Sequence, residues 1–256
     1  MYETKSGKKV SIVIPSKERA EAGTTWNLFP DATVFVHERE LEEYKKHLPN
    51  AKIETHTEDG GLTPIRNIIM RKISMGDWVI QLDDDIKVVG YFTADGDKKK
   101  KVKWSSKQHM NEWFNAIDLA EKSGFYLIGE SPTANEFYYR PERPHSINTF
   151  VEGHCMIIKR CELMFDEKCR VKQDYDYTLQ CAVSGRRVLR LDYLWSDYTY
   201  RKAAGGCMDT WKKSGLEEEV YNYMMNKWKG LLIPKRNRAS SPYEFTMRVP
   251  KEWSNQ

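Results

Sequence analysis

The strongest constraint on this chain is the triplet Asp83-Asp84-Asp85, which directly follows the apolar run Trp78–Leu82. The run is typical of a buried strand, so three carboxylates lie where the chain leaves the core. A carboxylate removed from water either changes its pKa or acquires a partner. A hard divalent ion, Mg²⁺ or Mn²⁺, takes oxygen ligands and also bridges phosphates. Because side chains alternate along a strand, Asp83 and Asp85 should share one side and Asp84 the other. The alternative interpretation is an acidic turn on the surface.

Strands and helices alternate through the first third of the sequence. Short apolar runs predict three strands, at 10–14, 33–36 and 51–55. The charged stretch 38–47 predicts a helix, and a second helix is expected from about Thr63, with Thr63 as N-cap and Pro64 in the first turn. This order predicts a parallel, doubly wound sheet, in which ligands bind beyond the carboxyl ends of the strands. Segment Pro15–Arg19 and the aspartate triplet should therefore face one crevice.

The middle of the chain is less regular. Its patterns predict helices over 108–123 and 178–184 and strands over 125–129 and 153–158. Prolines and tyrosines indicate a loop at 131–147, and the lysine-rich stretch 95–103 is expected to be an exposed turn or hairpin tip. A second acidic cluster, Lys172–Tyr177, precedes the last of these helices.

Length, charge and cysteine content narrow the class of protein. The 256 residues are 40% hydrophobic, enough for a sizeable core. A net charge of +4 mildly favours an anionic partner. Five cysteines without CxxC or zinc spacing indicate reduced thiols. The N-terminus has no apolar leader and no apolar run could span a bilayer. We therefore expect a cytoplasmic protein without a membrane partner, located in the host cytoplasm if it is viral.

Four segments together resemble the GT-A glycosyltransferase superfamily. They are SIVIPSKER (11–19), GLTPIRN (61–67), QLDDDI (81–86) and Gln173-Asp174 before a helix. Within the superfamily the chain is most similar to the TET/JBP-associated glycosyltransferases, which include the base J glucosyltransferase and phage enzymes that glycosylate hydroxymethylated pyrimidines in DNA. The resemblance implies an α/β fold of GT-A type, with a Rossmann-like, mostly parallel sheet and flanking helices. It also implies a single domain, 1–256, divided into a nucleotide-sugar-binding half (8–90), an acceptor-side half (91–215) and a C-terminal helix with a basic tail (216–256).

The resemblance also implies roles for residues on the donor side. Asp85 matches a ligand of Mn²⁺ or Mg²⁺, and Asp83 matches a nucleotide or metal contact. Because three aspartates are consecutive, the match to the family motif could be shifted by one residue. The implied nucleotide-sugar-binding residues are Pro15, Ser16, Lys17, Arg19, Arg66, Asn67, Asp83 and Asp84. A cation beside a helix N-terminus suits a diphosphate. The alternative for Arg66 is an ordinary surface position on a helix.

On the acceptor side, the resemblance makes Asp174 the candidate general base of an inverting transfer. The usual acidic pair of the superfamily is Glu-Asp, and here Gln173 replaces the glutamate; Asp174 could alternatively cap the following helix. Acceptor contacts are expected from His154, Asp176 and Arg201, and His154 could equally be structural. The third metal ligand is left open among Asp192, Asp197, Asp209 and water.

The expected activity is transfer of a sugar from a UDP-sugar to the hydroxyl of a 5-hydroxymethyl pyrimidine in DNA. Candidate DNA contacts are the cationic segments 98–103 and 235–238, the arginines 186, 187 and 190, and the aromatic residues Trp104, Tyr138, Tyr139 and Trp195. The glycine-containing segment 198–206 is expected to be a loop that closes over donor or acceptor. The alternatives are transfer to a protein or glycan hydroxyl, an inactive binding module of the same fold, and a nucleotidyltransferase.

Overall fold

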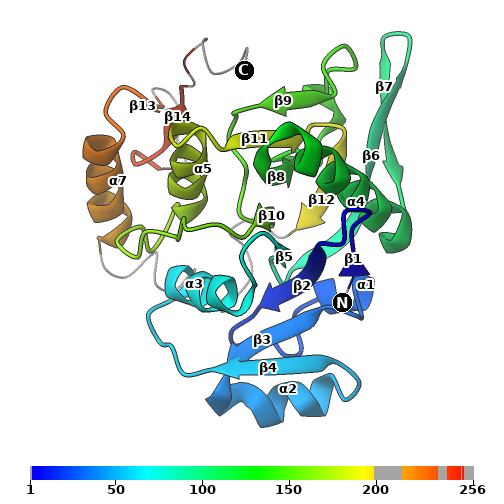
Figure 1. The fold of residues 1–256 in the computed structure, drawn as a ribbon, viewed down its shortest axis with the longest axis vertical. Coiled ribbons are helices and arrows are strands. Elements are labelled where there is room, and N and C mark those ends of the chain that lie inside the picture. Colours follow the sequence, from blue (N-terminus) through cyan, green and yellow to red (C-terminus); the bar gives the residue numbers. More distant parts are fainter. Residues whose placement is uncertain (1, 199–214, 236–240, 249, 251–256) are drawn as a thin grey trace.

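The computed structural model describes residues 2–198, 215–235, 241–248 and 250. Within them a nine-stranded sheet has the order β4-β3-β2-β5-β10-β8-β11-β9, with β1 paired to β2 (Figure 1). The strands are β1 (Tyr2–Glu3), β2 (Lys9–Pro15), β3 (Thr33–His37), β4 (Lys52–His56), β5 (Trp78–Leu82), β8 (Phe125–Glu130), β9 (His145–Ile147), β10 (Cys155–Lys159) and β11 (Arg187–Leu191).

Most strands of this sheet run in one direction. β4, β3, β2 and β5 pair in parallel. β10 is antiparallel to both β5 and β8, so β8 and its parallel neighbour β11 share the direction of the first four. The sheet is therefore the mixed, mostly parallel α/β sheet that the sequence predicts, with β10 inserted as a reversed strand at its centre.

Helices cover both faces of the sheet because side chains of each strand alternate between the faces. Val13 of β2 packs in the cluster that contains α3 (Leu62–Lys72) and α5 (Gln173–Val183). Ile12 and Ile14 pack in the opposite cluster. That second cluster contains residues of α1 (Thr25–Leu28), α2 (Leu41–His47) and α4 (Ser106–Ser123). A 3₁₀ turn, η1 (Glu38–Glu40), leads into α2.

Two smaller sheets complete the described structure. β6 (Ile86–Asp95) begins directly after the aspartate triplet and pairs with β7 (Lys98–Lys103) and β12 (Leu194–Tyr198). The β6–β7 hairpin projects beside the main sheet, and η2 (Glu136–Tyr138) precedes β9 (Figure 1). Near the C-terminus, α7 (Leu216–Lys227) packs on α5 together with the hairpin β13 (Leu232–Pro234) and β14 (Phe245–Met247).

Two helix starts differ from the sequence-based expectation. α3 begins at Leu62 with Gly61 as N-cap, and the Thr63 hydroxyl donates instead to the Cys169 carbonyl (2.8 Å). The predicted N-cap role of Thr63 is therefore wrong. α5 begins at Gln173, five residues before the expected start, so that Asp174 lies in its first turn. The lysine-rich stretch 95–103 forms a hairpin, in which β7 pairs with the end of β6 and Lys98, Lys100 and Lys103 are exposed.

Candidate active site

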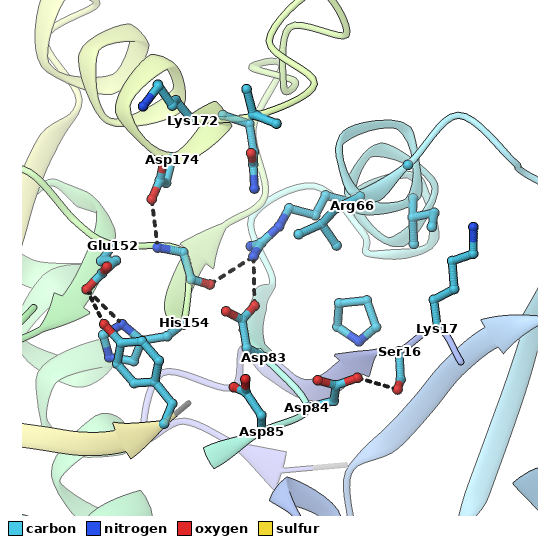
Figure 2. Close-up of a pocket in the computed structure, with 18 of the residues that line it drawn as sticks. Ser16, Lys17, Arg66, Asp83, Asp84, Asp85, Glu152, His154, Lys172 and Asp174 are labelled. Carbon is cyan, nitrogen blue, oxygen red and sulfur yellow. Dashed lines mark hydrogen bonds and ion pairs between the residues drawn. The ribbon is translucent and has the colours of Figure 1, made fainter. Parts of the chain in front are cut away.

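A cavity of about 1250 Å³ opens at the carboxyl ends of β2, β3, β4 and β5. Its walls include Pro15–Arg19 from the end of β2 and the aspartate triplet from the end of β5. The expectation that these two segments face one crevice is confirmed. The opposite wall is formed by Glu152–His154 before β10 and by the first turn of α5 (Figure 2).

The backbone of the triplet is held by α1. The Thr25 hydroxyl donates to the Asp83 carbonyl (2.6 Å) and accepts from the Ile86 N–H (2.9 Å). On the other side, the Asp83 N–H donates to the His154 carbonyl (2.9 Å), which extends the β5–β10 pairing by one step. The three aspartates are thus presented by a rigid backbone between two elements.

The side chains of the triplet alternate as predicted from strand geometry. Asp84 is buried and points toward Ser16, whereas Asp83 and Asp85 point to the side of Glu152 and His154 (Figure 2). Asp84 accepts a hydrogen bond from the Ser16 hydroxyl and pairs with Arg19, whose Nη1 lies 2.6 Å from Oδ1. Ser16, Arg19 and Asp84 therefore form a hydrogen-bonded network that lines the cavity.

Asp83 and Asp85 carry more negative charge than their surroundings neutralise. Burial raises the pKa of Asp83 to about 7. The positive charge of Arg66 opposes this rise, and the negative charges of Asp85 and Asp84 add to it. Burial and then Asp84 also raise the pKa of Asp85, even though Arg19 Nη1 lies 3.6 Å from its Oδ2. Two half-buried carboxylates held on one side with raised pKa values fit a hard divalent cation, which would supply the missing positive charge.

Another group of possible metal ligands, formed by Asp166, Cys169 and Asp176, is less suited to a metal ion. Ligand atoms of Asp166, Cys169 and Asp176 lie within 4.8 Å of one another. The Lys227 ammonium already bridges it, 2.6 Å from Asp166 and 2.7 Å from Asp176. A cation there would have to displace this lysine, so we regard the cluster as a contact between α5 and α7.

Arg66 and Asn67, both on α3, have buried side chains that bind protein groups. The Arg66 guanidinium donates to the Gly153 carbonyl (2.8 Å) and faces Asp83 Oδ1 at 3.4 Å. The alternative of a surface helix position for Arg66 is therefore wrong. Asn67 exchanges hydrogen bonds with the backbone of Phe165 and donates to Glu167. Arg66 reaches the cavity wall, whereas Asn67 fastens the loop after β10.

Asp174 faces the triplet from the opposite wall (Figure 2). Its carboxylate accepts from the N–H groups of Gly153 (3.0 Å) and Tyr175 (2.9 Å). Burial and the negative charge of nearby Glu152 raise the pKa of Asp174, although these two hydrogen bonds lower it in part. The first turn of α5 thus fixes the carboxylate while leaving it with enhanced basicity.

Glu152 belongs to a network of side chains within this wall. It accepts from the Tyr198 hydroxyl (2.6 Å), and its Oε2 lies 3.5 Å from His154 Nδ1. His154 is buried, stacks on Tyr198 and lies 3.8 Å from Glu130. Burial alone would lower the pKa of His154, but Glu130 and Glu152 raise it to about 10. His154 is therefore an imidazolium between two carboxylates at neutral pH.

The other predicted site residues are placed as follows. Pro15 and Lys17 line the cavity, and the Lys17 side chain is half exposed. Asp176 is fully buried away from the cavity, where it accepts from Trp228 and pairs with Lys227. Arg201, and with it most of segment 198–206, lies outside the described residues. Among the candidates for a third metal ligand, Asp197 lines the cavity, Asp192 is bound to Arg190 and Ser146, and Asp209 is not described.

Sequence reasoning missed several residues of the cavity wall. Glu152, Lys172 and Tyr175 all line it, although the sequence assigned no role to any of them. Lys172 has a left-handed backbone (φ 58°) just before α5. Their positions depend on strands and loops that pair over long sequence distances, so no local spacing reveals them.

Most of the aromatic residues expected to stack on a base are unavailable. Trp195 and Tyr139 are buried, and Trp104 packs on Tyr91 with ring centroids 4.3 Å apart. Tyr138 alone of these four is exposed. The three arginines bind groups of the protein itself: Arg186 pairs with Glu162, Arg187 donates to the Ser123 carbonyl, and Arg190 pairs with Asp192. Residues 236–238 of the basic tail lie outside the described part of the chain.

The sequence model of the TET-Associated Glycosyltransferase family matches residues 10–206 of this chain. None of the curated proteins matches the sequence. None of the helices in the described part of the chain has the length and apolar character needed to cross a membrane.

Solved structures of GT-A glycosyltransferases resemble the fold. GalNAc-T7 with UDP, GalNAc and Mn²⁺ superimposes with a TM-score of 0.53 at 12% identity, covering 87% of this chain and 48% of that chain. S. aureus TarS 1–349 gives a TM-score of 0.48 at 11% identity, covering 85% of this chain and 66% of that chain. The chain therefore spans about half to two thirds of the length of these proteins.

Proposed function

The chain belongs to the TET-associated glycosyltransferase family, and from this premise we propose that it transfers a sugar from a UDP-sugar to a 5-hydroxymethyl pyrimidine in DNA. It is a nucleotide-sugar-dependent glycosyltransferase with a GT-A fold. One observation carries the finer proposal: Asp83 and Asp85 on one wall of the cavity face Asp174 on the other (Figure 2). A donor bound at the triplet would therefore present its sugar to a carboxylate base.

On the donor side, the difficult step is departure of the anionic diphosphate. Asp83 and Asp85 would hold Mn²⁺ or Mg²⁺, and such an ion stabilises the leaving diphosphate as a Lewis acid. Pro15, Ser16, Lys17, Arg19 and Asp84 form the adjoining wall for the nucleoside. The half-exposed Lys17 ammonium, 3.9 Å from Glu18, would add a cation near the phosphates. Arg66 acts on this site through Asp83, whose Oδ1 lies 3.4 Å from the Arg66 guanidinium.

On the acceptor side, Asp174 would remove the proton of the acceptor hydroxyl as the oxygen attacks the anomeric carbon. A general base works best when its pKa is raised toward the operating pH. Burial and Glu152 provide that rise, and the Gly153 and Tyr175 N–H groups fix the orientation of the carboxylate. A single base opposite the leaving group supports an inverting transfer. His154 would take part by holding Glu152. Of the other two residues expected to contact the acceptor, we retain Arg201 only, because Asp176 is buried in the contact between α5 and α7.

The test is release of free nucleoside diphosphate from a panel of UDP-sugars with Mn²⁺, with and without hydroxymethylated DNA. We expect release that requires DNA, together with a gain of one sugar mass by the DNA. Asp174→Asn should lower turnover by about 10³-fold with nucleotide affinity retained, and Asp85→Asn should remove the Mn²⁺ dependence. Asp31→Asn, an exposed position remote from the cavity, is the matched control.

The outcomes separate the alternatives. Release that is indifferent to DNA would instead support transfer to a protein or glycan hydroxyl, because the same donor site serves either acceptor. DNA binding without release from any sugar, unaffected by Asp85→Asn, would support an inactive binding module and contradict the proposal.

A further inference from the structure

A basic and aromatic ridge borders the cavity mouth. We define it as strand β7 (Lys98–Lys103) together with Phe137 and Tyr138 of η2. Five of the six residues of β7 are lysines, and residues 95–103 carry these five lysines against two aspartates. For a chain with a net charge of +4, this is a strong local concentration of positive charge.

The two parts of the ridge are fastened to each other. The Lys99 ammonium donates to the Phe137 carbonyl (2.9 Å) and lies 5.8 Å from the centre of the Phe137 ring. Strand alternation places Lys101 and Lys103 on the same side of β7 as Lys99. A row of cations therefore runs along the edge of the hairpin next to the aromatic pair.

The aromatic pair is exposed to an unusual degree. Phe137 is 75% exposed and Tyr138 is 62% exposed, and their rings touch edge to face with centroids 5.6 Å apart. Large apolar rings held in water beside cations cost free energy unless a partner covers them. An anionic partner with flat apolar faces suits both features, and nucleic acid has both phosphates and bases.

The ridge leads into the cavity. Lys101 lines the cavity wall, where its ammonium lies 4.1 Å above the Trp195 ring. Residues Pro132–Asn135, just before η2, also line it. A nucleic-acid strand that lies along the ridge would therefore have one nucleotide within reach of the cavity mouth.

We propose that this ridge is the docking surface for the DNA acceptor, with the lysines of β7 binding phosphates and Phe137 and Tyr138 stacking on unpaired bases. The inference rests on the proposed DNA acceptor. Stacking on exposed rings requires bases that are not stacked in a duplex, so the ridge binds single-stranded DNA or the bases flanking a flipped nucleotide.

The experiment measures fluorescence anisotropy of a labelled 20-nucleotide DNA containing 5-hydroxymethylcytosine, single-stranded and as a duplex, over a salt series. Lys99→Ala/Lys103→Ala should reduce the slope of log affinity against log salt by about 1.4 for the single strand. Phe137→Ala/Tyr138→Ala should weaken binding about tenfold or more at fixed salt, with the slope unchanged. Slow hydrolysis of the UDP-sugar without DNA should be unaffected in both.

Matched controls lie on elements that do not belong to the ridge, and α2 lies at the opposite end of the molecule from β7 (Figure 1). Lys45→Ala/Lys46→Ala on α2 removes two lysines, and Met75→Ala removes an apolar side chain that is also 62% exposed. Neither should change DNA binding. The charge variant gives a readout even if the aromatic variant fails to fold.

The two proposals fail in different ways. If the wild type modifies DNA but both ridge variants bind it like the controls, the ridge is not the docking surface, and the proposed function stands. If the wild type neither binds nor modifies DNA while it does transfer sugar to another acceptor, the DNA acceptor and the ridge are both wrong.

Discussion

Asp83 is a partly buried carboxylate and Glu130 a fully buried one, and their surroundings move their pKa values in opposite directions. Burial raises the pKa of Asp83, and Arg66 compensates only in part. Glu130 is fully buried, yet His109 and His154 hold its pKa well below the usual range. Glu130 also accepts from Trp113 (2.6 Å) and Ser196 (2.6 Å). The charge of Glu130 is thus satisfied within the protein, whereas that of Asp83 calls for an external cation.

This difference predicts the response of the metal-free protein to pH. Folded Asp83 takes up a proton near pH 7, whereas the unfolded carboxyl, with a pKa near 3.8, stays charged. The folded state binds more protons in this window, so stability should rise as pH falls from 8 to 6. We expect melting temperatures in EDTA to rise in this direction for the wild type, and less for Asp83→Asn.

Mn²⁺ should reverse the trend, because the metal and the proton compete for the same carboxylate. Its affinity should fall by up to about tenfold for each pH unit below 7 if one proton is displaced. Titration calorimetry at pH 6, 7 and 8 measures this. An equal pH dependence in Asp83→Asn would show that another group is responsible.

At the scale of elements, the sequence predicts where strands end better than where helices begin. An apolar run stopped by Pro15 or by Asp83 shows where a strand leaves the core, and parallel strands bring such ends together. Helix starts depend on distant partners. The Thr63 hydroxyl binds the carbonyl of Cys169, 106 residues away, and the first turn of α5 is supported by Gly153 and by α7. Local capping rules do not contain those contacts.

The α5–α7 contact predicts that Asp176 has a structural role. Its carboxylate is fully buried and accepts from Trp228 and Gln180 while it pairs with Lys227. Removing one partner of a buried pair costs about 3–5 kcal/mol. Asp176→Ala should therefore lower the free energy of unfolding by about 3 kcal/mol, measured by urea denaturation, with the KM for the acceptor unchanged at low temperature.

Lys227→Met tests the same contact from the other helix. If the two residues act as a pair, the double variant should lose less stability than the two single variants together. A raised acceptor KM in Asp176→Ala, with stability preserved, would instead favour the acceptor contact expected from the sequence.

For the whole molecule, the two halves of the described chain, before and after residue 90, share one sheet, and their junction lies at the candidate site. The first half supplies β2–β5, the second supplies β8–β11, and β5 pairs with β10 at the centre. Glu130, at the end of β8, joins α4 through His109, β12 through Ser196 and the cavity wall through His154. The mostly parallel sheet could be anticipated from the sequence, but this junction could not, because its members come from four separate parts of the chain.

The junction predicts a stability profile with two limbs. The lowered pKa of Glu130 contributes stability that is present above its unfolded pKa of about 4.5 and is lost as pH falls below it. His154, raised from 6.5 to about 10, contributes stability that is fully present below pH 6.5 and is lost as pH rises through 10. Glu130→Gln keeps the shape but removes one of the two carboxylates that face the imidazolium, so it should cost about 3 kcal/mol or more at pH 7. Urea unfolding at pH 5, 7 and 9.5 should show a smaller loss of unfolding free energy at pH 9.5, where wild-type His154 is itself beginning to lose its proton.

The control for this variant is Glu43→Gln, exposed on α2, which should match the wild type at every pH. A uniform cost for Glu130→Gln across this range would mean that hydrogen bonds to Trp113 and Ser196, and not the charge pair, hold the two halves together.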